Sequence, residues 1–125
     1  MNVLVKKIPL ANGLTVFMHD CTYRYYGDFY LVKIEIICEV PVCEEYFEDR
    51  EDFLQARKLL GEGVSYRRIL EQMGVPSTGI EYVREMLMQN FIDHSLPYFS
   101  RASFPGKFVL SRYTKAKRRP GRQVA

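Results

Sequence analysis

The sequence predicts an α+β fold: a three-stranded antiparallel β-meander, then a trihelical unit and a short C-terminal strand. Three observations lead to this prediction. Apolar and polar residues alternate with a period of two over residues 30–40, which is typical of a half-buried strand. Asn12-Gly13 lies between two apolar runs and is a strong hairpin signal. From Glu44 onward the apolar residues recur with helical spacing instead.

The meander is expected over residues 1–43. Its first turn is Asn12-Gly13, because both positions of a tight two-residue hairpin loop need φ > 0. Pro9 has no N–H group to donate, so the first strand is expected at the edge of the sheet. In the third strand the even-numbered residues from 30 to 40 share one face, and Pro41 ends the strand. Residues 21–28 are expected to form a loop or a flared hairpin end.

The helical unit is expected over residues 44–93. Helices are expected at residues 44–60, 65–73 and 78–90, a turn at 74–76, and a loop region at 94–114 with a short strand at 107–113. The first of these helices begins with acidic residues and ends with Arg57 and Lys58, which suits the helix dipole. Thr78 and Glu81 have the spacing of a capping box at the start of the last helix.

Charge is distributed unevenly along the chain. Hydrophobic residues make up 47% of the sequence, so residues 1–114 are expected to form a single domain with an ample core. Residues 115–125 carry a charge of +5 and no acid, and they are expected to form a disordered basic tail, whereas the remaining 114 residues sum to −2. Lys6 and Lys7 interrupt any signal peptide, and no apolar run reaches the roughly 20 residues of a membrane span, so a cytoplasmic location is expected.

Residues 66–85 resemble the helix-turn-helix unit of DNA-binding proteins, in the form found in sigma-factor and response-regulator output domains. The resemblance is carried by apolar or small residues at five positions, namely Ile69, Gly74, Val75, Ile80 and Val83. In such a unit two short helices cross at a wide angle, and small or apolar residues at these positions let them touch. The N-terminal part of the chain resembles small uncharacterised bacterial proteins, and that resemblance implies no activity.

The helix-turn-helix resemblance implies a DNA-binding regulatory protein that contacts duplex DNA as a homodimer. The residues expected to bind nucleic acid are Arg67, Arg68, Ser77, Thr78, Tyr82, Arg84, Lys115, Lys117, Arg118 and Arg119. The arginines of the unit would position it on phosphates, Ser77, Thr78 and Tyr82 would touch base edges, and the tail would add non-specific affinity. The meander, with its edge strand and aromatic loop, is the expected dimerisation surface.

The alternative function is a protein-interaction or dimerisation module in which the helix-turn-helix serves only as packing. Glu81 and Glu85 lie on the face that would meet DNA, and carboxylates there repel phosphate. In an interaction module they could instead be contact residues. The aromatic segment "CTYRYYGDFY" likewise fits a protein interface better than a surface for stacking bases.

No enzyme, metal or cofactor is expected. His19, Cys21, Cys38 and Cys43 have the side chains of a zinc site, but the expected strand pairing holds Cys21 and Cys38 apart. Zinc therefore remains a minor alternative, and reduced thiols are the favoured interpretation. The acidic cluster that follows Cys43 fits an ordinary helix N-terminus, and no small-molecule substrate is evident.

Overall fold

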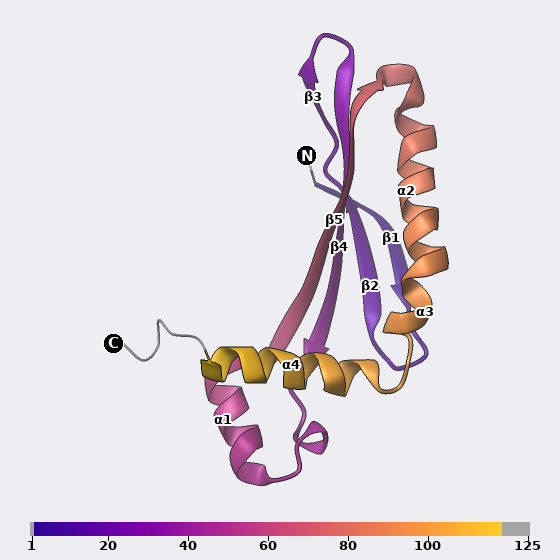
Figure 1. Cartoon of the computed structure of the whole chain (residues 1–125). Helices are drawn as coiled ribbons and strands as arrows, with labels where there is room; N and C mark the ends of the chain where they lie inside the picture. Colours follow the sequence, from indigo (N-terminus) through magenta and orange to yellow (C-terminus); the bar gives the residue numbers. More distant parts are fainter. Residues whose placement is uncertain (1, 119–125) are drawn as a thin grey trace.

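The computed structural model describes residues 2–118 and shows a five-stranded antiparallel sheet with helices at one face and one end (Figure 1). The strands are β1 (Val3–Pro9), β2 (Thr15–Asp20), β3 (Tyr23–Tyr26), β4 (Phe29–Pro41) and β5 (Gly63–Pro76). The helices are α1 (Arg50–Leu60), α2 (Ile80–His94), α3 (Leu96–Phe99) and α4 (Phe104–Arg118), with short 3-10 turns η1 (Glu44–Tyr46) and η2 (Ser77–Gly79).

Strand β4 is the centre of the sheet. One of its edges pairs with β2 over residues 34–38 and with β3 over residues 29–31. Its other edge pairs with β5 along its whole length, from Pro41 opposite Gly63 to Phe29 opposite Pro76. Strand β1 lies outside β2, and β5 lies on the other side of β4, so both are outermost strands, while the short β3 is outermost where it pairs with the start of β4.

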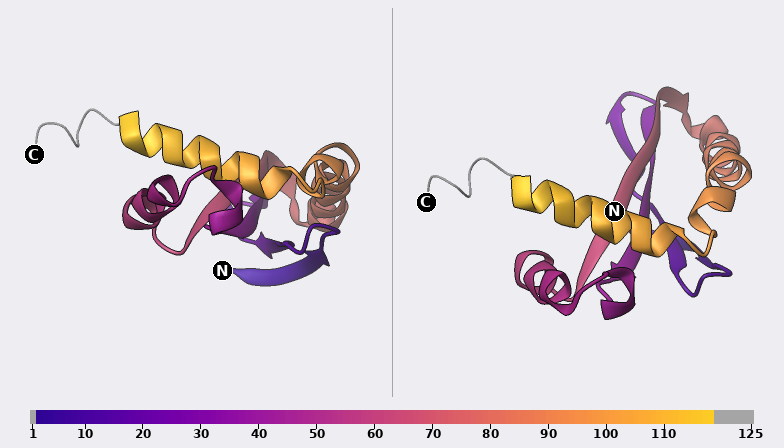
Figure 2. Two further views of the ribbon diagram at one scale, coloured as in Figure 1. Left: turned by 90° about the horizontal axis from the view of Figure 1, so that it is seen from below. Right: turned by 60° about the horizontal axis from the view of Figure 1, so that its bottom comes forward.

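The core lies on one face of the sheet. The even-numbered residues of β4 from Val32 to Val40 are all buried, and Met18 beside them is fully buried. Helix α2 runs along this face, whereas α4 crosses the ends of β4 and β5 beside α1 (Figures 1 and 2). The hydroxyl of Tyr113 in α4 donates a hydrogen bond to Asp52 of α1 at 2.9 Å, which ties these two helices together.

Several of the expected elements are present. Strands β1 and β2 form the hairpin expected around Asn12-Gly13, and β1 with its Pro9 is an outermost strand. The prediction that both Asn12 and Gly13 have φ > 0 was wrong, because of the two only Gly13 has a positive φ, of 92°. Asn12 instead donates side-chain hydrogen bonds to the carbonyls of Phe99 and Arg101, at 2.7 and 2.9 Å, and so holds the hairpin against the C-terminal helices.

The predicted trihelical unit was wrong, because residues 63–76 form strand β5 and not a helix and a turn. A helix of nine residues is marginal in water, whereas β4 offers a long edge on which the inward backbone groups of β5 find partners. Gly74 does take the positive φ expected of it, 71°, but at an irregularity of the β4–β5 ladder. The helix-turn-helix fold is therefore absent from residues 66–85.

Three further boundaries differ from the prediction. Residues 23–26 pair with β4 as β3, so the N-terminal part is not a simple three-stranded meander. Helix α2 begins at Ile80, and no side chain caps it, so the capping box is absent. The short strand expected at 107–113 lies inside α4, where Val109, Tyr113 and Ala116 form one buried helical stripe.

Part of the segment expected to be a disordered tail is helical. Lys115, Lys117 and Arg118 belong to the last turn of α4, so the boundary after residue 114 falls within a helix. Residues 119–125, which include Arg119, lie outside the described part of the chain.

Candidate functional site

The most distinctive surface of the described chain is the outer edge of β5, the side of that strand that faces away from β4. The N–H group of Val42 donates to the carbonyl of Glu62 at 2.9 Å, and the ladder continues from there without a shift to Val32 opposite Gln72. The even-numbered residues of β5 therefore direct their N–H and C=O groups toward β4 and form the hydrogen bonds of the ladder. The backbone groups of the odd-numbered residues, Ser65 to Glu71, point outward.

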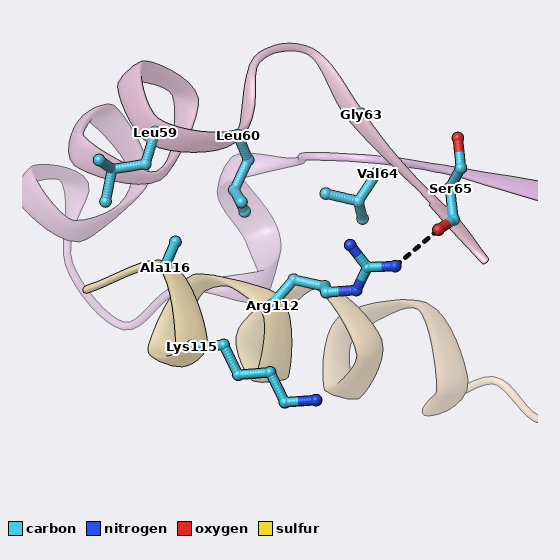
Figure 3. Close-up of a pocket in the computed structure, with 8 residues that line it drawn as sticks. All are labelled: Leu59, Leu60, Gly63, Val64, Ser65, Arg112, Lys115 and Ala116. Atoms are coloured by element: carbon cyan, nitrogen blue, oxygen red, sulfur yellow. Dashed lines mark hydrogen bonds between the residues drawn. The ribbon is translucent and has the colours of Figure 1, made fainter. Parts of the chain in front are cut away.

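One outward group at the start of this edge is occupied. The guanidinium of Arg112 in α4 donates to the carbonyl oxygen of Ser65 at 2.8 Å (Figure 3). This contact independently confirms that the odd-numbered residues face away from β4. Because Arg112 belongs to α4, this contact is also where the unoccupied part of the edge begins.

Beyond Ser65 the edge is open. Arg67, Ile69, Glu71 and Met73 are all exposed, Ile69 by 42% and Met73 by 66%. Within residues 2–118, the outward backbone groups of Arg67, Ile69 and Glu71 have no hydrogen-bond partner. A row of unpaired donors and acceptors of this kind is a template for another strand.

The sheet face opposite the core carries both charged and apolar side chains next to this edge. Arg67 binds Glu35 of β4 at 2.8 Å, and Lys33 of β4 lies directly opposite Glu71. Ile37 is half-buried on the same face. His19 lies opposite Glu35, and its buried Nδ1 has no partner among the described residues. The face is therefore neither fully polar nor covered by a helix.

The arginines expected to bind DNA make contacts within the protein instead. Arg67 and Arg68 point to opposite faces of β5, where Arg67 binds Glu35 and Arg68 donates to Ser95 at 3.3 Å over the Phe91 ring. Arg84 is half-buried and forms an ion pair with Asp20 at 2.9 Å. These three guanidiniums do not form one surface that could follow a phosphate backbone.

The other predicted nucleic-acid residues are also dispersed. Ser77 and Thr78 lie in η2 and Tyr82 is exposed by 73% near the start of α2, at one end of the molecule. Lys115, Lys117 and Arg118 lie at the far end, on α4 (Figure 1). The structure thus separates the residues expected to read bases from the cations expected to add affinity.

The last turns of α4 carry a second, cationic surface. Helix α4 contains five basic residues and no acid, namely Lys107, Arg112, Lys115, Lys117 and Arg118. A cavity of about 600 Å³ separates α4 from the start of β5, with Leu59, Leu60 and Val64 on one side and Arg112 and Lys115 on the other (Figure 3). This cavity is open to solvent and adjoins the outer edge of β5.

The Asp20–Arg84 ion pair joins β2 to α2. Burial acts to raise the pKa of Asp20, but hydrogen bonds from Thr22 and the charge of Arg84 outweigh it, so the pKa lies below its ordinary value of 3.8. The N–H group of Thr22 donates to one carboxylate oxygen at 2.9 Å. Because the folded pKa is depressed, the pair stabilises the protein at neutral pH, and this stabilisation is lost as the pH falls through the folded pKa.

Replacing Arg84 with Met is expected to lower the free energy of unfolding at neutral pH by about 1–2 kcal/mol, because it leaves a partly buried carboxylate without its cation. Urea unfolding should show the full loss at pH 7 and a progressively smaller loss as the pH falls through the depressed pKa of Asp20, where the carboxylate becomes protonated in both proteins. Arg50→Met is the matched control. Its ion pair with Glu44 is exposed, so the change should cost at most about 0.5 kcal/mol at either pH. Equal losses for the two variants would show that burial of the Asp20 pair adds nothing.

The potential metal ligands of residues 2–118 are dispersed over the fold. No three His, Cys, Asp or Glu side chains in that range come together as a metal site. Cys21 lies beside Lys33, whereas Cys38 pairs with Val16 further along the sheet, and all three cysteines are free. No helix in the same range is both long enough and apolar enough to cross a membrane.

Sequence reasoning missed the outer edge of β5 because it assigned those residues to helices. A signal was present, because Val64, Tyr66 and Leu70 are apolar at even-numbered positions and lie in or against the core. The same segment also contains apolar residues at helical spacing, which led to the other assignment. The chain matches no protein-family model, no curated protein and no solved structure.

Proposed function

We propose that this chain is a protein-interaction module that binds an extended segment of a partner by strand addition along the outer edge of β5. The observation that carries the proposal is the open run of outward backbone groups over Arg67, Ile69 and Glu71. This keeps the interaction function that the sequence offered as its alternative. The helix-turn-helix scaffold assumed with it is not part of the proposal, since residues 66–76 are a strand.

Strand addition uses the backbone for affinity and alternate side chains for specificity. On β5 the side chains that flank the edge on the open face are a cation, an isoleucine and an anion, in the order Arg67, Ile69, Glu71. The residues of a partner strand that lie opposite these three would be an anion, an apolar residue and a cation. Unused edges are commonly short, covered, or protected by lysine or proline, whereas β5 has 14 residues and the charges along its open edge, Arg67 and Glu71, have opposite signs.

The test is a variant that removes one outward donor without disturbing the fold. Ile69→Pro deletes an N–H group that β4 does not use, and proline is tolerated at such edge positions. Short displayed peptides selected on the wild-type chain should lose binding to Ile69→Pro, and on wild type they should protect the Arg67, Ile69 and Glu71 amides from hydrogen exchange. The matched control is Tyr82→Ser, which alters an exposed residue on α2 and should leave binding unchanged.

Two results would contradict the proposal. Peptides that bind wild type and Ile69→Pro equally do not use the edge. Protection that appears on other amides, with Arg67, Ile69 and Glu71 unchanged, would place the interaction elsewhere. Circular dichroism and thermal unfolding of Ile69→Pro would verify that the fold persists.

We propose contact with a polyanion such as duplex DNA as the second candidate, supported by the five basic residues and no acid on α4. Counterion release would make such binding salt-dependent. A triple change of Lys115, Lys117 and Arg118 to Gln should weaken binding of mixed-sequence duplex DNA and flatten its salt dependence in fluorescence anisotropy. The control is a triple change of Lys6, Lys7 and Arg24 to Gln, at strands far from α4 along the chain. Equal loss in the two triple variants would indicate only an effect of net charge.

A cytoplasmic location is part of the same proposal. Cys21, Cys38 and Cys43 are free thiols, which fits a reducing compartment. Burial raises the pKa of the Cys38 thiol to about 11, so this group stays protonated and unreactive at neutral pH.

A further inference from the structure

We propose that the segment added at the outer edge of β5 is β5 of a second copy, which runs antiparallel about a two-fold axis at Ile69. Arg67 of each copy then faces Glu71 of the partner subunit. This inference rests on the proposed function and names its partner. It is carried by the charge order along the edge and by the direction in which the backbone groups point.

The backbone geometry restricts the pairing. Only odd-numbered residues of β5 offer outward N–H and C=O groups, so an odd-numbered residue must lie opposite an odd-numbered residue of the partner subunit. A two-fold axis at Ile69 satisfies this rule at every position. It places Ile69 opposite Ile69 of the partner subunit, and Arg67 opposite Glu71 of the partner subunit, all as hydrogen-bonded pairs.

Charge selects this register among its neighbours. An axis at Arg67 or at Arg68 would place that arginine opposite its own copy, and an axis at Glu71 would oppose two carboxylates. An axis at Leu70 would leave Arg67 opposite Met73 of the partner subunit, with no ion pair. Of these five registers, only the axis at Ile69 gives two opposite-charge pairs, and opposite charges across antiparallel strands stabilise the pairing.

The charges of β4 extend this pattern away from the axis. Arg67 already binds Glu35 at 2.8 Å, and Lys33 lies opposite Glu71 in the same sheet. Across the two-fold axis, Glu35 and Arg67 of one copy would therefore continue into Glu71 of the partner subunit and Lys33 of the partner subunit. The signs alternate through the interface, so each arginine gains a second carboxylate without meeting another cation.

The opposite edge of the sheet does not offer this complementarity. Strand β1 carries Lys6 and Lys7 and no acid among its seven residues, and it ends at Pro9. Two copies of β1 would bring only cations together, and lysine and proline at an edge are common protection against pairing. The dimer surface expected from the sequence was the meander, and the charges favour β5 instead.

The length of the shared ladder is limited at both ends. Arg112 occupies the carbonyl of Ser65, and the β4–β5 register shifts beyond Gln72. The continuous ladder therefore runs from Arg67 to Glu71 in each copy. Because so short a ladder buries less than a standard interface, the dimer is expected to be reversible, with a dissociation constant on the order of micromolar.

Charge reversal tests the register. In sedimentation velocity over a concentration series, wild type should dimerise, and Arg67→Glu or Glu71→Arg alone should raise the dissociation constant about tenfold or more, because each reversal opposes like charges twice. An equimolar mixture of the two single variants should dimerise again. In the mixed dimer both positions of one copy carry carboxylates and both positions of the other carry guanidiniums, so each pair across the axis has opposite charges. Glu35→Gln is the control, because it removes the intrachain partner of Arg67 and leaves the pairs across the axis intact.

Cross-linking tests the axis itself. Two Ile69 Cα atoms would lie about 5.5 Å apart in a hydrogen-bonded pair, within the range of about 4.4–6.8 Å that a disulfide spans. Ile69→Cys, in a background of Cys21→Ser and Cys43→Ser, should form a disulfide-linked dimer under mild oxidation. Met73→Cys is the matched control on the same strand, because its two copies would lie about 26 Å apart.

The outcomes separate the two proposals. If wild type stays monomeric at all concentrations while Ile69→Pro still abolishes peptide binding, the second copy is wrong and the interaction edge stands. A dimer that survives both charge reversals, or that cross-links equally through Met73→Cys and Ile69→Cys, overturns the register. If no edge variant loses either peptide binding or self-association, both proposals are overturned.

Discussion

Ile36→Ala is expected to lower the free energy of unfolding by about 3–4 kcal/mol, which would be a large share of the stability of a small domain. Ile36 is fully buried at the centre of β4 and packs against the core face between Ile34 and Cys38. Removing three carbon atoms there leaves a cavity that rigid neighbours on two flanking strands cannot close. Urea unfolding followed by circular dichroism measures the change.

Ile37→Ala is the matched control for this prediction. The two isoleucines are adjacent on one strand, but Ile37 points to the opposite, open face and is only half-buried. Its replacement should cost about 1 kcal/mol in dilute protein. If Ile37→Ala were as costly as Ile36→Ala, another part of the protein or a second copy would have to cover the open face. If that cost also decreased when the protein was diluted, self-association would be what buries Ile37.

Phe99→Ala is expected to destabilise the protein by about 3–5 kcal/mol. The Phe99 ring is buried and its centroid lies 4.6 Å from that of Tyr66 in β5, 5.8 Å from that of Phe91 in α2 and 4.8 Å from that of Phe104 in α4. One side chain thus joins the sheet to two helices. Thermal unfolding should show a large fall in the melting temperature.

Tyr98→Ala provides the comparison for Phe99. Tyr98 precedes Phe99 in α3 and contacts Phe99 and Phe104 of the same cluster, but 48% of it is exposed, so its loss should cost about 1 kcal/mol. Similar costs for the two variants would mean that the aromatic cluster is loosely packed and that the helices are held mainly by other contacts, such as the hydrogen bond from Asn12 to the Phe99 carbonyl.

The parts of the fold that the sequence predicted are those in which local and non-local preferences agree. Strand β4 alternates between more and less buried residues along most of its length, and the Asn12-Gly13 hairpin needs only neighbouring residues to form. Residues 63–76 were misread because their apolar residues satisfy both a helical and a strand spacing. The deciding factor is the long free edge of β4, far earlier in the chain, which a local pattern does not reveal.

The candidate site depended on the same misreading. Arg67 and Arg68 look alike in the sequence, yet on a strand they face opposite sides, one toward Glu35 and the other toward Ser95. Arg84 was expected to contact DNA phosphates and instead binds Asp20, a partner 64 residues away. Lys115, Lys117 and Arg118 differ from these arginines in having no acidic residue on their own helix, α4, to neutralise them.

The antiparallel pairing of β4 with β5 also governs the order in which the chain can fold during synthesis. Strands β1 to β4 pair among neighbours, but one side of β4 has no partner until residues 63–76 have been made, after an intervening helix. At about 5–20 residues per second, the ribosome needs on the order of two to seven seconds to add the roughly 35 residues from the end of β4 to the end of β5. A delay of this size separates the emergence of β4 from the ribosome and the emergence of β5, and during it the nascent chain presents a 13-residue strand with one apolar face to chaperones and to neighbouring nascent chains. Slower elongation after β4 has emerged and before β5 emerges would lengthen this exposure and lower the yield of folded protein, although it changes no residue.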